Sequence, residues 1–245
     1  MSEPLGSNNP RMQLLRRLTG RRSARLEHGL FLVEGPTLVA EAVASGWPIQ
    51  DVYVEESARS LLPVGVRHTV VRDGVLAKVM SVETARPIVA VAELRALPFP
   101  SSPTFVIVGT GVSDPGNLGT ILRTAEAAGA DGVVLMPGSV DPFSPKVVRS
   151  SAGAIFRLPV MVDADPRTLG LPLFGTVAAG GVPYDRAHLT IPLALVLGNE
   201  AHGLPDDFLL DGLLTIPHVG QSESLNVAMA AAVLCFEIAR QRRSA

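Results

Sequence analysis

Three segments of this 245-residue chain hold polar side chains that could carry out chemistry, and in two of them these side chains follow an apolar run that predicts a buried strand. They are residues 114–129, 193–203 and 215–228. An arginine, a carboxylate and several amide or hydroxyl side chains occur in them, and such groups orient a substrate, stabilise a developing negative charge or accept a proton. The candidate catalytic residues are Asn117, Arg123, Glu200, Ser224 and Asn226.

Residues 114–129 predict a helix that presents Arg123 beside open space. A Pro-Gly pair turns the chain, Asn117 is a suitable N-cap, and apolar residues recur at helical spacing. Arg123 falls off this apolar face, and the residues three, four and seven positions before it are small. Its guanidinium could bind an RNA phosphate or ribose, whereas the alternative is a surface ion pair with Glu126.

The apolar run in 193–203 predicts a buried strand that ends at Gly198. Because glycine has no Cβ, Gly198 lets the backbone approach a ligand closely, and Asn199 follows it. Glu200 at a strand end can reach a cleft instead of being buried without a partner. Glu200 is therefore a candidate general base and a candidate partner for Arg123, although a solvated carboxylate in a glycine-rich connection is the alternative.

Residues 215–228 offer apolar surface together with backbone hydrogen-bonding groups. Ile216 and Leu225 in this combination suit an adenine ring, which needs an apolar slot and hydrogen bonds at its edge. Ser224 and Asn226 would direct small polar groups to the same place, and Asn226 could also cap the following helix. That helix, 227–239, is apolar nearly all round, so we expect it to be buried together with its cysteine, the only one in the chain.

The elements between these segments predict an α/β protein. Apolar strands separated by helical segments indicate a doubly wound parallel sheet with helices on both faces after residue 104. Residues 25–95 alternate strands and helices in a smaller α/β module, and 96–103 has the composition of a linker. A dinucleotide-binding fingerprint is not present, because Asp114 stands where the third glycine of G-x-G-x-x-G would be.

Composition and charge narrow the class further. Hydrophobic residues make up 47% of the chain, and no apolar run reaches membrane-spanning length, so we expect a globular cytoplasmic protein. The net charge is −2, yet residues 1–30 hold six arginines against two acidic residues. This basic arm suits contacts with RNA phosphates, although a solvated terminal helix is the alternative. The arginines expected to bind RNA here are Arg16, Arg17, Arg21 and Arg22.

Taken in order, the three segments closely resemble the three motifs of the SpoU (TrmH-like) RNA ribose methyltransferases, which belong to the SPOUT superfamily. The resemblance covers 104–245, and 25–95 is similar to the L30e-like substrate-binding domain that often accompanies it. It implies an L30e-like RNA-binding domain over 25–95 and a SpoU methyltransferase domain over 104–245. Charge and composition add a basic arm over 1–24 and the linker over 96–103. A C-terminal trefoil knot is implied as well.

The resemblance implies methyl transfer from S-adenosylmethionine to a ribose 2′-hydroxyl of RNA by a homodimer that needs no metal. Arg123 would then manage the proton or orient the ribose, with Glu200 as the other possible base. Asn117 and Ser224 would position groups, and Asn226 would support the third motif. Cofactor contacts are expected from Gly198, Asn199, Ile216 and Leu225, and a phosphate contact from Arg149, whose alternative is an ordinary surface charge.

Several alternatives stay open at this point. The N-terminal domain favours ribosomal over transfer RNA only by analogy, and the RNA and nucleotide are not specified by the sequence. A housekeeping role and a role in antibiotic resistance are both compatible with the motifs. A transfer RNA methyltransferase, an inactive RNA-binding knotted protein and a nucleotide-dependent enzyme of the Rossmann type are the competing functions.

Overall fold

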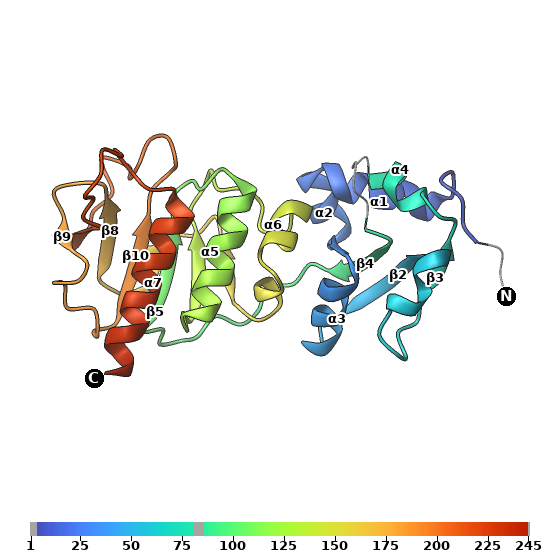
Figure 1. Cartoon of the computed structure of the whole chain (residues 1–245), viewed down its shortest axis with the longest axis horizontal. Coiled ribbons are helices and arrows are strands. Elements are labelled where there is room, and N and C mark those ends of the chain that lie inside the picture. Colours follow the sequence, from blue (N-terminus) through green and yellow to red (C-terminus); the bar gives the residue numbers. More distant parts are fainter. Residues whose placement is uncertain (1–3, 81–85, 245) are drawn as a thin grey trace. The chain divides into compact units, whose positions relative to one another are not determined.

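The computed structural model describes residues 4–80 and 86–244, and the chain forms two compact units (Figure 1). The first unit comprises Met1–Arg95 and Phe143–Phe156, and the second comprises Ala96–Pro142 and Arg157–Ala245. The chain therefore leaves the second unit once and returns to it.

The first unit is built on a four-stranded mixed sheet in the order β1-β4-β2-β3. β4 pairs antiparallel with both β1 and β2, whereas β3 pairs parallel with β2. The strands are β1 (Leu30–Glu34), β2 (Ile49–Glu55), β3 (Thr69–Val71) and β4 (Ile88–Glu93). In the described residues before 95 the helices are α1 (Pro10–Gly20), α2 (Arg22–His28), α3 (Pro36–Ala44), α4 (Val75–Met80) and the 3-10 helix Glu56–Leu61.

Helix α1 belongs to the core of this unit, which corrects the expectation of a separate basic arm over 1–24. Met12, Leu15 and Leu18 are fully buried and pack with residues of β1, β3, β4 and α4. Their spacing of three residues puts them on one helical face, and the arginines occupy the other. The Asn9 side chain accepts a hydrogen bond from the Arg11 backbone amide at 3.0 Å and caps the helix.

Residues 143–156 also pack in the first unit, although their sequence lies within the predicted domain 104–245. They form α6 (Pro145–Ser150) and the 3-10 helix Ala154–Phe156. Phe143 and Phe156 contact Phe31, with ring centroids 5.0 and 6.5 Å apart, and Phe156 also meets the edge of Trp47. The first unit therefore completes its aromatic core with residues from far along the chain.

The second unit is a parallel seven-stranded sheet in the order β7-β6-β5-β10-β8-β11-β9. Its central strands are continuous apolar runs, buried on both faces as parallel strands usually are. The strands are β5 (Phe105–Gly109), β6 (Gly132–Leu135), β7 (Val160–Val162), β8 (Leu173–Val177), β9 (Val182–Pro183), β10 (Leu193–Leu197) and β11 (Gly212–Thr215).

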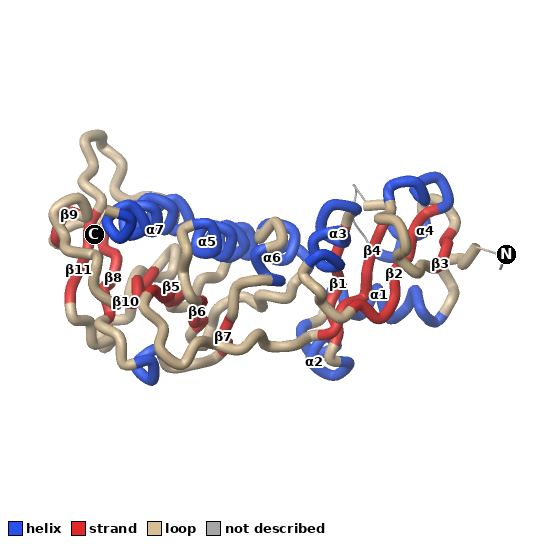
Figure 2. The backbone as a smooth tube through the Cα atoms, turned by 90° about the horizontal axis from the view of Figure 1, so that it is seen from below, coloured by secondary structure: helices blue, strands red, loops and turns tan. Residues whose placement is uncertain are grey.

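Helices α5 (Pro115–Ala127) and α7 (Val227–Arg243) lie side by side on one face of this sheet (Figure 2). The core of the other face is covered by apolar side chains from loops and from the short 3-10 helix Pro166–Leu169. The parallel sheet of an α/β protein is thus confirmed. In the described part both long helices cover one face, and the helix on the other face is the short 3-10 helix Pro166–Leu169. The trefoil knot stays a prediction.

Helix α7 is buried on one face and exposes apolar side chains on another, so the expectation that it would be buried all round is wrong for the single chain. Leu234, Cys235 and Ile238 are buried, and burial raises the pKa of the Cys235 thiol to about 12. Met229, Val233 and Phe236 are 54%, 37% and 49% exposed. Within the part of the chain that the structure describes, no helix is both long and apolar enough to cross a membrane.

The burial of α1 predicts a loss of stability on Leu15→Ala. Removing a fully buried leucine side chain should lower the free energy of unfolding by about 2–5 kcal/mol. Urea unfolding followed by fluorescence of Trp47, the only tryptophan, reports on the first unit. The matched control, Arg16→Ala on the exposed face of the same helix, should stay within about 0.5 kcal/mol of wild type. Equal stability of the two variants would show that α1 is not part of the core.

Candidate active site

A chain of hydrogen bonds connects the three polar segments at the start of α5. The Asn117 side-chain amide donates to Glu200 Oε1 at 3.0 Å, and the Asn117 carbonyl oxygen accepts from Asn226 Nδ2 at 3.0 Å. The Asn226 carbonyl oxygen in turn accepts from the backbone amides of Ala228 and Met229 and caps α7. One asparagine thus joins the loop after β10 to the first turns of both long helices.

Glu200 is held by four donors. Besides Asn117, the Ser113 backbone amide and hydroxyl donate to Oε2 at 3.1 and 2.9 Å, and the Asp114 backbone amide donates to Oε1 at 3.1 Å. Partial burial alone would raise the pKa of Glu200, but the hydrogen bonds from Asn117, Ser113 and Asp114 outweigh it and lower the pKa to about 2. The carboxylate also lies at the positive end of the α5 dipole.

These contacts change two expectations. A carboxyl group with a pKa near 2 is a poor proton acceptor at neutral pH, so the geometry does not support Glu200 as the general base. It assigns Glu200 the role of holding the start of α5. The N-cap of α5 is Asp114, whose side chain accepts from the Asn117 backbone amide at 2.9 Å. Asn117 is therefore free of the capping role, and its side chain links Glu200 to Asn226.

The loop after β10 is shaped by Asn199. Its side-chain amide donates to the Gly111 carbonyl at 2.6 Å, and its side-chain carbonyl accepts from the amides of Ala201 and His202. The backbones of Asn199 and Gly203 exchange two hydrogen bonds, which closes the turn. A Cβ on Gly198 would lie 2.5 Å from the Gly203 backbone. Glycine is required there by the turn itself, in addition to any approach of a ligand.

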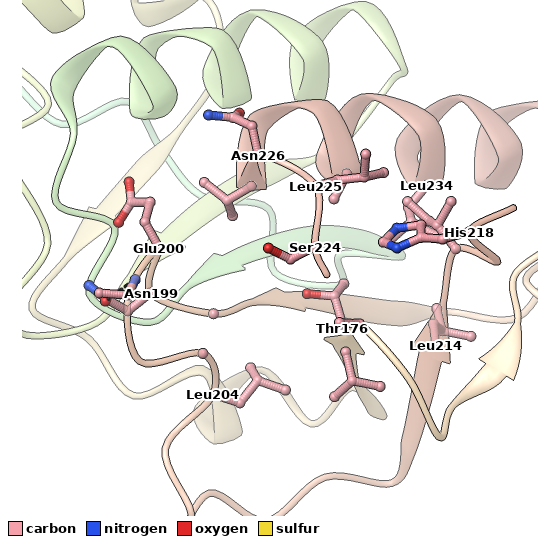
Figure 3. Close-up of a pocket in the computed structure, with 18 residues that line it drawn as sticks. Thr176, Asn199, Glu200, Leu204, Leu214, His218, Ser224, Leu225, Asn226 and Leu234 are labelled. Carbon is pink, nitrogen blue, oxygen red and sulfur yellow. Dashed lines mark hydrogen bonds between the residues drawn. The ribbon is translucent and has the colours of Figure 1, made fainter. Parts of the chain in front are cut away.

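A pocket of about 580 Å³ opens between this loop, the ends of β8 and β11, and the start of α7 (Figure 3). The predicted cofactor contacts Gly198, Asn199, Ile216 and Leu225 all line it, as do Glu200, Ser224 and Asn226. Further apolar lining comes from Leu204, Leu214 and Leu234. The volume falls in the usual range for a small-molecule site, and an apolar lining with few polar groups is typical of one.

Arg123 is exposed on α5 and is not among the residues that line the pocket. The alternative of an ion pair with Glu126 is not observed, because Glu126 binds the Arg157 guanidinium at 2.7 Å. The suggested pairing with Glu200 is not observed either, since the hydrogen bonds of that carboxylate come from Ser113, Asp114 and Asn117. The guanidinium of Arg123 is thus on the surface of the helix that Asn117 begins.

The predicted RNA-binding arginines occupy different settings. All four N-terminal arginines are exposed: Arg16 and Arg17 on α1, Arg21 between the helices and Arg22 on α2. Arg17 pairs with Glu27 at 3.1 Å. Arg149 on α6 instead donates to the buried Glu34 at 2.7 Å within the first unit. Burial raises the pKa of Glu34, while the charge of Arg149 opposes that shift. A buried carboxylate needs such a partner, so Arg149 has a structural role that the sequence did not indicate.

Two polar residues of the pocket were not anticipated, His218 and Thr176. His218 follows Ile216-Pro217 within the segment 215–228, so its position in the sequence was a signal that it lies at the pocket. Thr176 lies on β8, which carried no motif, and only the strand order brings it to the pocket. Among residues 4–80 and 86–244, no group of three His, Cys, Asp or Glu side chains could hold a metal ion.

The lowered pKa of Glu200 predicts how stability depends on pH. Because the folded-state pKa lies below the ordinary value of 4.5, ionised Glu200 contributes stability above pH 4.5, and this contribution is lost as the pH falls towards 2. After allowance for its solvent exposure, we expect about 1 kcal/mol. The gap in unfolding free energy between wild type and Glu200→Gln should therefore shrink between pH 5 and pH 3.

Chemical unfolding at several pH values measures this gap. Glu223→Gln is the matched control, since Glu223 is exposed and lies in the loop before α7. A pH-independent gap for Glu200→Gln would show that the hydrogen bonds do not favour the ionised carboxylate.

Comparisons with known proteins agree with this arrangement. Residues 104–236 match the model of the SpoU rRNA Methylase family, and residues 9–90 match that of the MRM3-like substrate binding domain. The chain is 35% identical to the 23S rRNA (guanosine(2553)-2′-O)-methyltransferase RlmP of Bacillus subtilis, over 87% of this chain and 90% of that protein. It is 33% identical to a 23S rRNA (uridine(2479)-2′-O)-methyltransferase of Streptomyces viridochromogenes, over 97% and 92%.

Solved structures give the same result. The SpoU methyltransferase AviRb from Streptomyces viridochromogenes, in complex with the cofactor AdoMet, is similar with a TM-score of 0.84 and 32% identity, over 97% of this chain and 99% of that one. An AdoMet-bound rRNA methyltransferase from Sinorhizobium meliloti has a TM-score of 0.84 and 31% identity, over 97% of each chain. From the family models, the relatives and the structures together, this chain belongs to the SpoU rRNA methylase family.

Proposed function

We propose that this protein transfers a methyl group from S-adenosylmethionine to a ribose 2′-hydroxyl of ribosomal RNA. The single observation that carries the proposal is the junction at Asn117, which joins Glu200 and Asn226 beside an apolar pocket. This junction brings the three predicted motifs to one place. The sulfonium cofactor supplies an activated methyl group when bound, and the protein supplies the pocket, the orientation and the charge stabilisation.

The apolar pocket residues would take up the cofactor, and Gly198 allows the loop after β10 to lie close to it. Ser224 lines the same pocket and offers a hydroxyl for positioning. Asn117 and Glu200 act through the backbone, because they fix the start of α5 relative to α7. That arrangement determines where the exposed face of α5 is presented to RNA, and Arg123 lies on that face.

Arg123 is the residue we assign to the ribose. An arginine side chain keeps its proton in proteins, so its guanidinium would orient the ribose and a nearby phosphate and stabilise negative charge that develops on the 2′-oxygen. Support comes from its exposure and from the absence of an ion pair to it in the described residues. Glu200 is saturated with hydrogen bonds and is left out of proton transfer.

The first unit favours ribosomal RNA over transfer RNA as the substrate. This unit matches a substrate-binding domain model, and the relatives named above act on 23S rRNA. The exposed arginines of α1 and α2 would contact phosphates from a folded platform, since the other face of α1 is anchored in the core. Arg149 is left out of this surface because it pairs with Glu34. A cytoplasmic location is part of the same proposal.

We expect Arg123→Ala to abolish methyl transfer while cofactor affinity is kept, because Arg123 does not line the pocket. Transfer from labelled S-adenosylmethionine to ribosomal RNA should fall by about 100-fold or more, the loss typical for removal of one charge-stabilising group. Calorimetry with S-adenosylhomocysteine should give unchanged binding. The control is Arg167→Ala, whose guanidinium pairs with Asp165 on the surface.

Turnover at the wild-type rate in Arg123→Ala would overturn the assignment of Arg123. Absence of transfer by the wild-type protein on any RNA, with cofactor binding intact, would favour the inactive RNA-binding alternative.

We also propose that the protein is a homodimer whose interface includes α7. Met229, Val233 and Phe236 form an exposed apolar stripe at spacings of four and three residues, which is one face of the helix. Large apolar side chains gathered on a surface usually mark an interface. The opposite face of α7 is already buried, and its last turn is fixed by hydrogen bonds from Gln241 and Arg242 to the segment before β10.

Phe236→Glu should dissociate such a dimer, because it places a charge in the middle of the apolar stripe. Sedimentation velocity should show a species near 51 kDa for wild type, twice the 25.7 kDa chain, and 25.7 kDa for the variant. Arg243→Glu, a charge change at the exposed end of the same helix, is the control and should leave the mass unchanged. A monomeric wild-type protein at micromolar concentration would reject the proposal.

A further inference from the structure

The pocket has two ends of different chemistry (Figure 3). Asn199 and Glu200 lie at one end, and Leu214 and Leu234 lie at the other, on the side of His218. Both polar side chains at the first end are occupied by hydrogen bonds within the protein. At the apolar end, His218 is a polar group whose ring borders the cavity.

The tautomer of His218 follows from the hydrogen bond that its Nδ1 makes. Nδ1 lies 3.1 Å from the Ser222 backbone carbonyl, which can only accept, so Nδ1 carries the proton and donates. In the neutral ring, Nε2 is then an acceptor with a lone pair. Within the described residues no hydrogen bond to Nε2 is recorded. The loop before α7 thus fixes the ring and leaves one acceptor for a ligand.

We propose that His218 Nε2 accepts a hydrogen bond from the exocyclic amino group of the cofactor's adenine and so selects adenine over other purines. A flat purine fits the apolar end, where leucine side chains can pack on its faces. Among the polar groups of that base, the exocyclic amine is a donor, which is what a lone acceptor requires. His218 is thereby a specificity-determining contact of the pocket, an assignment that rests on the proposed function.

The test uses a pair of ligands that differ at the proposed contact. In S-inosylhomocysteine a carbonyl oxygen replaces the amine of S-adenosylhomocysteine and the neighbouring ring nitrogen N1 gains a proton, so at the position of the amine an acceptor faces the acceptor Nε2. Calorimetry on the full-length wild-type protein should show weaker binding of the inosyl compound. One neutral hydrogen bond contributes roughly a 3- to 10-fold change in affinity.

Two variants remove the acceptor in different shapes, His218→Leu and His218→Phe, so that the test does not depend on either one folding. In both, the preference for the adenosyl ligand should fall by about the same 3- to 10-fold. His218→Gln, whose side-chain carbonyl can accept near the position of Nε2, should keep most of the preference. His188→Leu is the matched control, since His188 is exposed and does not line the pocket.

An unchanged preference in the Leu and Phe variants would overturn the inference. Equal weakening of both ligands is one form of this result, and it would show that the acceptor serves a ribose hydroxyl common to the two. Such a result leaves the proposed function intact, provided that wild type binds S-adenosylhomocysteine. Failure of wild type to bind either ligand would count against the proposed function itself.

Discussion

The position of the Glu200 carboxylate at the start of α5 is the constraint on which the site depends. Its oxygens accept two backbone amides, a hydroxyl and the Asn117 amide, so the loop after β10 is attached to the helix that carries Arg123. The free energy of these charge-assisted hydrogen bonds appears as a lowered pKa. A residue that the sequence offered as a candidate base is thereby committed to holding the start of α5.

Asn117 links Glu200 to Asn226 because its side-chain amide can both donate and accept a hydrogen bond. A side chain that only donates could hold Glu200, but it could not also accept from Asn226. The amide of Asn226 is itself oriented by its role as N-cap of α7. The lining of the pocket is therefore set by two helix starts, and in both the first free backbone amides are satisfied by a capping side chain.

The parallel sheet of the second unit was predictable from the sequence. Parallel strands buried on both faces are continuous apolar runs, and β5 and β10 are such runs. Among the pocket residues, Gly198 was found because it ends the run of β10, and Ile216 because it ends the apolar run that contains β11. Leu225 was found from its place beside Asn226 at the start of α7. The packing of α1 in the core was not predicted, because its arginines indicated a solvent-exposed arm. Met12, Leu15 and Leu18 lie on the opposite face of the same helix. Similarly, the donors around Glu200 come from Ser113 and Asp114, some 86 residues earlier, and sequence spacing carries no information on that contact.

The packing of Phe143 and Phe156 against Phe31 has a consequence for biosynthesis. During translation, residues 1–95 are synthesised well before residues 143–156, which complete the core of the first unit. At ~5–20 residues per second, roughly 3–12 seconds of translation separate residue 95 from residue 156. The first unit cannot complete its aromatic core until Phe143 and Phe156 have been synthesised, and β5 and β6 are made before them. The last step in folding of the first unit is therefore coupled to synthesis of part of the second unit.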